Sequence, residues 1–361
     1  MVSNELMIKF PNFHTKIFID QKFCNKFGNI VKKNLFCQNN TTVVIITDEE
    51  VFNLFAVEVK QSFLEAGFKV LIFKLHPGEK SKSFKSFEKL CNFLAENKVK
   101  RTDVLVSLGG GSVCDITGFV SGCYLRGVRL VNIPTTLLAM VDACVGGKTA
   151  INLKYGKNLV GCFKQPNLVF CNLSFVATLP YLQYSSAIAE VVKCAVLFSD
   201  RFFNFLAGCG TRLSERELKA VVLECLKIKK SLVEIDEFDE KGERIKLNFG
   251  HTIGHALETY FGHGKGLTHG QAVALGMSFC FQQGEKLGLT EQGEFEKLKF
   301  VLAKFKLPTQ MKGINFKTLL KICLNDKKSN HDGLKLVLVK KIGTCFVRKF
   351  SLIEFNRFLK A

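Results

Sequence analysis

The sequence predicts an α/β N-terminal domain with a Rossmann-like parallel sheet, followed by a mainly α-helical C-terminal domain. Apolar β-branched runs alternate with helical patterns as far as about residue 180. A Gly-Gly-Gly turn directly follows one of these runs, and long helical patterns dominate beyond Pro180. We therefore expect one domain at residues 1–180 and a second at residues 181–361.

The first half reads as strand, helix, strand, helix, strand and glycine turn. Strands are expected at residues 42–47, 69–75 and 103–108. One helical pattern ends at Gly67, and the next begins with Ser83 as its N-cap. This alternation is typical of parallel sheets, in which each crossover helix returns the chain to the same edge.

The second half has a different pattern, in which apolar residues recur at helical spacing over long stretches. A late hairpin is also expected around Gly343, from strands at residues 334–339 and 344–347. The expected helices lie at residues 181–198, 214–234, 249–261, 269–287 and 292–305.

Composition limits the classes of protein to be considered. The formal charge is 51 − 32 = +19, but the basic residues are dispersed rather than clustered, so we expect a solvated surface that favours small anions and no nucleic-acid partner. The N-terminus shows no signal pattern, and no apolar run is long enough for a membrane span. The 14 cysteines contain no Cys-x-x-Cys pair, so we expect reduced thiols in a cytoplasmic protein.

The turn Gly109-Gly110-Gly111-Ser112 has the composition of a phosphate-binding turn. Glycines allow backbone N–H groups to approach a pyrophosphate, and the following helix presents its positive end. The full dinucleotide fingerprint is incomplete because Cys114 stands where the third glycine is expected. A purely structural tight turn is therefore an alternative interpretation.

Gly146-Gly147-Lys148-Thr149 has the ending of a nucleotide-binding P-loop but not its beginning. The first glycine of that motif would fall at Asp142, so a nucleoside triphosphatase is not supported. Cations gather along this part of the sequence, where they suit a phosphate or a carboxylate: Arg126, Lys148, Lys154, Lys157 and Lys164.

Four of the seven histidines fall between residues 251 and 269. His251 and His255 share a helix face, so spacing alone favours them as paired metal ligands, although the helix lacks the glutamate of His-Glu-x-x-His metalloproteases. Glu190 and Lys193 share a face of an apolar helix. Glu190, His251 and His269 together would form an open three-ligand zinc site.

These motifs resemble the 3-dehydroquinate synthase family of sugar phosphate cyclases, and the matches occur in the family's order from about residue 44 to 340. The resemblance rests on the following segments: Gly109–Asp115, Tyr124–Arg129, Pro134–Leu138, Val141-Asp142, Gly146–Thr149, Gly156–Asn158, Ala189–Lys193, Arg244, Leu247–His251, Gly254–Glu258 and Asp326–Lys328.

The resemblance implies a dehydroquinate synthase-like fold, NAD, a zinc or cobalt cation, and a homodimer in which Arg126 reaches the phosphate of a neighbouring subunit's substrate. The implied metal ligands are Glu190, His251 and His269. The implied NAD-binding residues are Asp48, Glu79, Lys82, Gly110, Gly111, Ser112, Asp115, Thr135, Thr136, Lys157 and Thr178. The implied substrate-binding residues are Arg126, Asp142, Lys148, Asn158, Lys193, Lys230, Arg244, Asn248, His255 and one of Lys327 and Lys328. The implied catalytic residues are Glu240 and His255 as proton acceptors, together with Lys148.

The activity implied is conversion of 3-deoxy-D-arabino-heptulosonate 7-phosphate to 3-dehydroquinate and phosphate, in the shikimate pathway of aromatic amino acid biosynthesis. The expected course is oxidation by NAD⁺, β-elimination of phosphate, reduction and intramolecular aldol closure. The chain departs from the family pattern at Cys114, at Leu182-Gln183-Tyr184 and at Gln271, where the family usually has glutamate after His-Gly. His263 has no family counterpart, and the loop before His269 is two residues longer than usual.

The sequence leaves three alternative functions to be considered. A cousin cyclase such as 2-deoxy-scyllo-inosose synthase shares the chemistry, but Arg244 and the run Asp326-Lys327-Lys328 favour a substrate with a carboxylate. A glycerol dehydrogenase-type enzyme has no need for so many phosphate-facing cations. A nucleic-acid-binding protein explains the charge but not the histidine cluster.

Overall fold

The computed structural model describes residues 5–23, 26–262, 266–311, 313–326 and 334–360. The chain forms two compact units. The first unit contains Met1–Leu179 together with Lys229–Phe238, and the second contains Pro180–Ile228 together with Asp239–Ala361. The long helix α8 (Glu215–Ile235) therefore contributes residues to both units, a division that the sequence did not indicate.

The first unit is built on a seven-stranded sheet with the order β1-β2-β9-β6-β5-β3-β4. All neighbouring strands run parallel except β1, which pairs antiparallel with β2 at the edge. The predicted parallel α/β fold is confirmed, and β1, β2, β6 and β9 are additions to the three predicted strands, which correspond to β3, β4 and β5. The strands are β1 (Glu5–Phe10), β2 (Phe13–Asp20), β3 (Thr42–Asp48), β4 (Lys69–Leu75), β5 (Val104–Gly109), β6 (Arg129–Pro134) and β9 (Leu168–Asn172).

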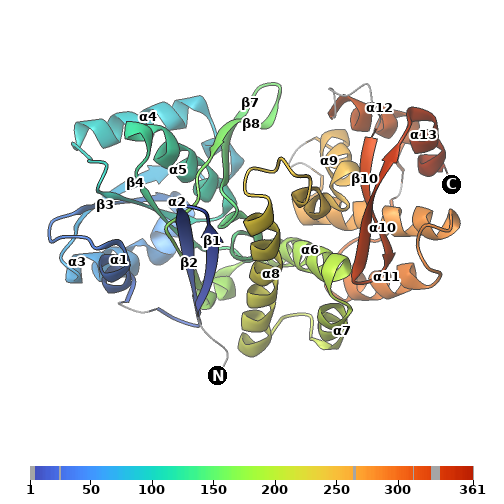
Figure 1. The fold of residues 1–361 in the computed structure, drawn as a ribbon, viewed down its shortest axis with the longest axis horizontal. Helices are drawn as coiled ribbons and strands as arrows, with labels where there is room; N and C mark the ends of the chain where they lie inside the picture. The colour runs from blue at the N-terminus through green and yellow to red at the C-terminus, as the bar shows by residue number, and fades with distance from the viewer. Residues whose placement is uncertain (1–4, 24–25, 263–265, 312, 327–333, 361) are drawn as a thin grey trace. The chain divides into compact units, whose positions relative to one another are not determined.

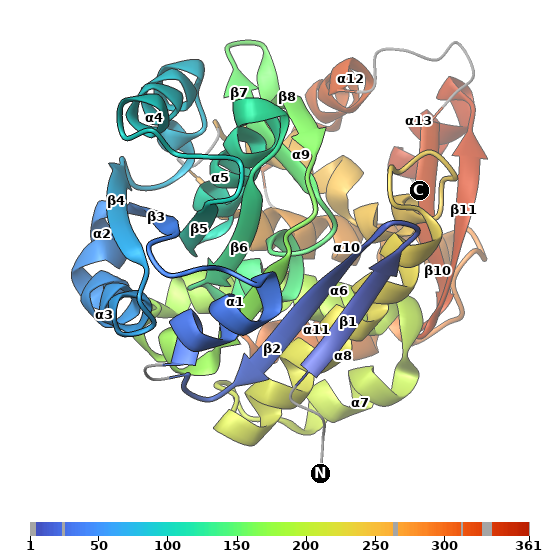
Figure 2. The same ribbon diagram turned by 60° about the vertical axis from the view of Figure 1, so that its left-hand side comes forward.

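Helices cover both faces of this sheet. α4 (Phe84–Glu96) and α5 (Gly111–Cys123) lie on one face, and α1 (Phe27–Leu35) and α3 (Val57–Glu65) lie on the other (Figures 1 and 2). The short α2 (Glu49–Val51) leads through a π-helical turn into α3. Because both faces are covered, the central strands are mostly apolar, and every residue of β5 is buried.

A separate hairpin, β7 (Lys148–Leu153) and β8 (Gly156–Phe163), packs against α5. This hairpin is not among the predicted strands, because its exposed side chains give no continuous apolar run. The strands approach closely at Gly161, where a Cβ atom would lie 2.1 Å from the carbonyl oxygen of Thr149.

The second unit is mainly helical, as predicted. Its central helix α6 (Tyr181–Phe198) is buried from Tyr184 to Leu197. A hairpin of β10 (Leu334–Lys341) and β11 (Thr344–Phe350) confirms the late strands. The other helices are α7 (Asp200–Gly208), α9 (His251–Tyr260), α10 (His269–Lys286), α11 (Glu294–Lys304), α12 (Phe316–Asp326) and α13 (Leu352–Lys360).

Every cysteine in the described ranges is a free thiol, and most are buried. Among the same residues, no helix combines the length and the hydropathy that crossing a bilayer requires.

Helices α9 and α10 approach each other through glycine. A Cβ atom on Gly276 of α10 would lie 2.0 Å from the carbonyl oxygen of Gly250, the residue before α9. Gly250 itself has φ 75°, a left-handed conformation that suits glycine. The close approach brings the start of α9, and with it His251, against α10.

We expect Gly276→Ala to lower the free energy of unfolding by about 1–3 kcal/mol, because the added methyl group must displace backbone. Urea denaturation measures this change. Gly208→Ala is the matched control, since a Cβ atom on Gly208 meets nothing within 4 Å. Equal stability of the two variants would contradict the close contact.

Candidate functional site

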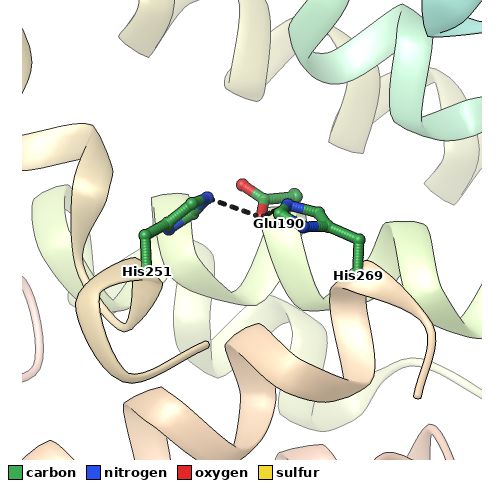
Figure 3. Close-up of side chains that lie close together, drawn as sticks. All are labelled: Glu190, His251 and His269. Atoms are coloured by element: carbon green, nitrogen blue, oxygen red, sulfur yellow. Dashed lines mark ion pairs between the residues drawn. The ribbon is translucent and has the colours of Figure 1, made fainter. Parts of the chain in front are cut away.

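Three side chains of the second unit converge on one point (Figure 3). Glu190 lies on α6, and His251 and His269 are the first residues of α9 and α10. The Nε2 atoms of both histidines lie 3.5 Å from Glu190 Oε1. One ligand atom from each residue lies within 4.8 Å of the others, so the group can hold a metal ion.

Local structure fixes the start of each histidine-bearing helix. Thr268 and Gln271 form a capping box at α10, in which each side chain accepts a hydrogen bond from the other's backbone N–H. Gly270 N donates to Ser186 Oγ over 2.9 Å, and a Cβ atom on Gly270 would lie 1.9 Å from the Ser186 carbonyl oxygen. Ser186 precedes Glu190 by one turn of α6, so this contact places His269 beside Glu190.

The charges around Glu190 fit a cation. Glu190 is 2% exposed, its Oε2 pairs with the buried Lys193, and its Oε1 has no hydrogen-bond partner in the described ranges. Burial alone would raise the pKa of Glu190, but Lys193 and the two imidazoles hold that pKa well below its usual range. A buried, ionised carboxylate oxygen that faces two imidazole nitrogens is a donor set suited to Zn²⁺, with a position left for another ligand.

The two histidines differ in protonation. Burial, assisted by Lys193, lowers the pKa of His251 to about 3. Burial also disfavours the charged form of His269, but Glu190 and Glu258 outweigh it and raise the pKa of His269 to about 10. Glu258, whose Oε2 lies 3.3 Å from His269 Nδ1, is not among the predicted site residues. Its spacing of three residues from His255 on α9 was an available signal.

Other predicted substrate-binding residues also lie in the second unit. Arg244 is 5% exposed and opens a 3₁₀ turn that ends at Asn248, just before α9. His255 is exposed, and its ring centroid lies 5.3 Å from that of His251. Glu240 is exposed in the loop before the turn. Lys327, Lys328 and His263 lie outside the described residues.

In the first unit, the glycine turn joins β5 to α5. Gly110 is the N-cap of α5. It has no side chain, so it makes no capping hydrogen bond to the backbone N–H groups at the start of this helix. A Cβ atom on Gly110 would lie 3.2 Å from the side chain of Thr136. Thr135 N donates to Gly109 O, while its buried Oγ1 has no partner among the described residues. These features fit a pyrophosphate at the helix start.

Four of the predicted residues meet at Lys82. Lys82 is 3% exposed, and its Nζ donates to Asp115 Oδ2 over 2.6 Å and to Asn158 Oδ1 over 2.5 Å. Glu79 Oε2 lies 3.7 Å from the same nitrogen. Burial raises the pKa of Asp115 to about 6, against the opposing effect of Lys82. Asn158, predicted to bind substrate, thus lies with three residues predicted to bind NAD.

The remaining NAD-binding candidates take different positions. Asp48 caps α2 by accepting from Val51 N. Thr178 Oγ1 donates to Phe175 O. Ser112 is half-buried in the first turn of α5, and Lys157 is exposed on β8.

Residues predicted to bind the substrate's anionic groups are also found in the first unit. Arg126 is exposed in a turn where Leu125 and Arg126 both have left-handed φ values of 50° and 61°. Lys148 is exposed at the start of β7.

Asp142 contacts a lysine that is not among the predicted site residues. Lys229, which is 7% exposed, donates from Nζ to both the carboxylate and the backbone carbonyl of Asp142. The predicted Lys230 instead pairs with Glu234 over 2.9 Å. The adjacent lysines face different sides of α8. Only the folded structure shows which of the two contacts Asp142.

Comparison with known proteins identifies the family. The model described as 3-dehydroquinate synthase N-terminal matches residues 72–186, and that described as 3-dehydroquinate synthase C-terminal matches residues 187–329. The chain is 36% identical over 345 residues to the 3-dehydroquinate synthase of Clostridium kluyveri, covering 95% of each chain. It is 38% identical over 346 residues to that of Clostridium acetobutylicum, covering 95% of this chain and 96% of the relative. The chain belongs to the 3-dehydroquinate synthase family.

Solved structures share this family's fold at lower identity. A 2-deoxy-scyllo-inosose synthase complexed with carbaglucose-6-phosphate, NAD⁺ and Co²⁺ has a TM-score of 0.86 at 22% identity, with 99% of each chain covered. The 2-epi-5-epi-valiolone synthase ValA from Streptomyces hygroscopicus, with NAD⁺ and Zn²⁺ bound, has a TM-score of 0.85 at 20% identity and covers 98% of this chain and 97% of ValA.

We expect metal binding to release about one proton at pH 7.5, because His269 is protonated in the metal-free protein below its pKa of about 10 and must lose a proton to bind a metal ion. Metal affinity should therefore rise with pH up to this value. Calorimetry in buffers of different ionisation enthalpy measures the protons released. Binding without proton release would contradict the protonation of His269.

Proposed function

We propose that this family member converts 3-deoxy-D-arabino-heptulosonate 7-phosphate to 3-dehydroquinate and phosphate. The observation that carries the proposal is the convergence of Glu190, His251 and His269 in a chain whose curated relatives of that activity are 36–38% identical over nearly its whole length. The activity makes the chain a phosphate lyase of aromatic amino acid biosynthesis.

We propose that the first unit binds NAD and the second binds the metal ion and much of the substrate. The glycine turn at the start of α5 supports NAD binding, and the ionised Glu190 with its two histidines supports Zn²⁺ or Co²⁺. When bound, NAD⁺ supplies a reversible hydride acceptor and the metal ion polarises the reacting oxygens.

The side chains of this chain supply binding and proton transfer. Arg244, fixed by burial, suits the substrate carboxylate, and Lys148 suits its phosphate. Lys193 is held against Glu190, where it can meet a substrate oxygen near the metal ligands. Asn248, three residues before His251, can donate an amide N–H to the same substrate.

His255 is the proposed proton acceptor nearest the metal ligands. Its ring lies 5.3 Å from that of His251 and 6.0 Å from that of His269, so a substrate held there lies within its reach. Glu240 is proposed as a second acceptor. Asp142, held by Lys229, is proposed to orient a substrate hydroxyl.

We further propose a cytoplasmic homodimer in which Arg126 contacts the phosphate of the partner's substrate. The exposed left-handed turn at Leu125 and Arg126 supports this role, because it projects a cation that makes no ion pair among the described residues.

A cousin cyclase activity is the second candidate, favoured by the fold shared with 2-deoxy-scyllo-inosose synthase and ValA. Activity with glucose 6-phosphate or sedoheptulose 7-phosphate, and none with the heptulosonate phosphate, would assign the chain to that branch.

We expect inorganic phosphate release from the heptulosonate phosphate to require both NAD⁺ and a divalent metal ion, with 3-dehydroquinate as the product. A phosphate assay with and without a chelator, together with chromatographic identification of the product, tests this. Phosphate release that persists in metal-free, NAD-free protein would contradict the proposal.

We expect His255→Ala to lower kcat by about 10²–10⁴-fold through loss of a proton acceptor. Lys148→Ala should raise KM as well as lower kcat, since it removes a phosphate-binding cation. Steady-state kinetics measures both changes. Lys85→Ala is the control, because Lys85 is an exposed lysine on α4 with no role in the proposal. Unchanged turnover in either test variant would refute its assignment.

A further inference from the structure

A second carboxylate contacts the ring of His269 on the side away from Glu190. Glu258 lies on α9 and is 8% exposed. Its Oε2 is 3.3 Å from His269 Nδ1, whereas Glu190 Oε1 is 3.5 Å from His269 Nε2. The imidazole is therefore held between two carboxylates, one on each ring nitrogen.

Gln271 has a different role, although the family usually has a glutamate at this position. Its Oε1 accepts a hydrogen bond from Thr268 N over 2.9 Å, and its own N–H donates to Thr268 Oγ1 over 3.3 Å. This reciprocal cap fixes the start of α10, and either glutamate or glutamine can form it. The carboxylate that faces His269 is Glu258, not residue 271.

We propose that Glu258 is the positioning residue of the metal centre and that Gln271 acts only on the start of the helix. A neutral imidazole carries one N–H. With Nδ1–H donated to Glu258, the lone pair of Nε2 faces Glu190 and His251, which is the tautomer that a metal ion at those residues needs. The inference rests on the metal centre proposed above.

The same carboxylate also belongs to a second group of donors. Ligand atoms of His255, Glu258 and His269 lie within 4.8 Å of one another. If this group held an ion of its own, Glu258 would be a ligand rather than a positioning residue. Metal stoichiometry distinguishes the two roles, because a positioning residue leaves one ion per chain.

The experiment compares the wild type with Glu258→Gln, Glu258→Ala and Gln271→Ala. Metal-free protein is titrated with Zn²⁺ against a chromophoric chelator, and with Co²⁺ while the visible absorption spectrum is recorded. We expect Glu258→Ala to weaken metal binding about 10–100-fold and to change the Co²⁺ spectrum. Glu258→Gln keeps an acceptor oxygen and should lie between the wild type and Glu258→Ala.

Gln271→Ala is the matched control for damage to helix α10. It should lower the melting temperature through loss of the cap while leaving metal affinity and the Co²⁺ spectrum unchanged. Thermal denaturation of all variants, followed by circular dichroism, separates loss of fold from loss of positioning. If Glu258→Ala does not fold, the metal affinities and Co²⁺ spectra of Glu258→Gln and Gln271→Ala are compared instead, and this comparison tests whether Glu258 positions His269.

Four results overturn the inference. Wild-type metal affinity in folded Glu258 variants would show that the carboxylate does not position His269. Equal losses of affinity in Gln271→Ala and Glu258→Ala would assign the effect to the helix start. Two ions per wild-type chain and one per Glu258→Ala chain would make Glu258 a ligand. A wild type that binds no metal ion would overturn the proposed metal centre itself, and the inference with it.

Discussion

The arrangement of the second unit depends on one buried negative charge. Glu190 lies in the middle of a helix that is otherwise almost wholly apolar and buried. An ionised carboxylate in such surroundings is costly unless cations or donors compensate it. Lys193 on the same helix and His269 at the start of another supply that compensation, with the neutral ring of His251 completing the group. The elements that carry these side chains are thus held around the charge that they satisfy.

Small residues make this arrangement possible. Gly270 allows the start of α10 to touch the backbone of α6 at Ser186, and Gly276 allows the same helix to touch the residue before α9. Larger side chains at these positions would force the helix backbones apart. The residues that supply the donor atoms and the residues that set the spacing between the helices are therefore different.

Much of this structure could be predicted from the sequence. The apolar runs predicted β3, β4 and β5, and the glycine turn marked the start of α5 correctly. The half-exposed strands of the β7–β8 hairpin gave no comparable periodic signal. In the candidate site, spacing alone favoured His251 and His255 as partners. The structure instead groups His251 with His269 and Glu190, because contacts between helices are not encoded in the spacing within one helix.

Residues that act through a neighbour were the hardest to find. Glu258 ends a segment that the motifs identified, and Lys229 is adjacent to a predicted residue, yet each points to its partner only because of how its helix is rotated. Lys229 and Lys230 illustrate this, since adjacent positions on a helix differ by about 100° in direction. A sequence motif identifies the segment that carries a function. It identifies less securely which of two adjacent residues of the same type performs that function.

The capping of α10 bears on how this chain is aligned with its relatives. Both histidine donors are the first residues of their helices, and the start of α10 is fixed by Thr268, Gln271 and the contact of Gly270 with Ser186. The position of His269 is therefore set by local contacts at this helix start. In an alignment with relatives, His269 is better placed by the start of its helix than by its distance in sequence from His251.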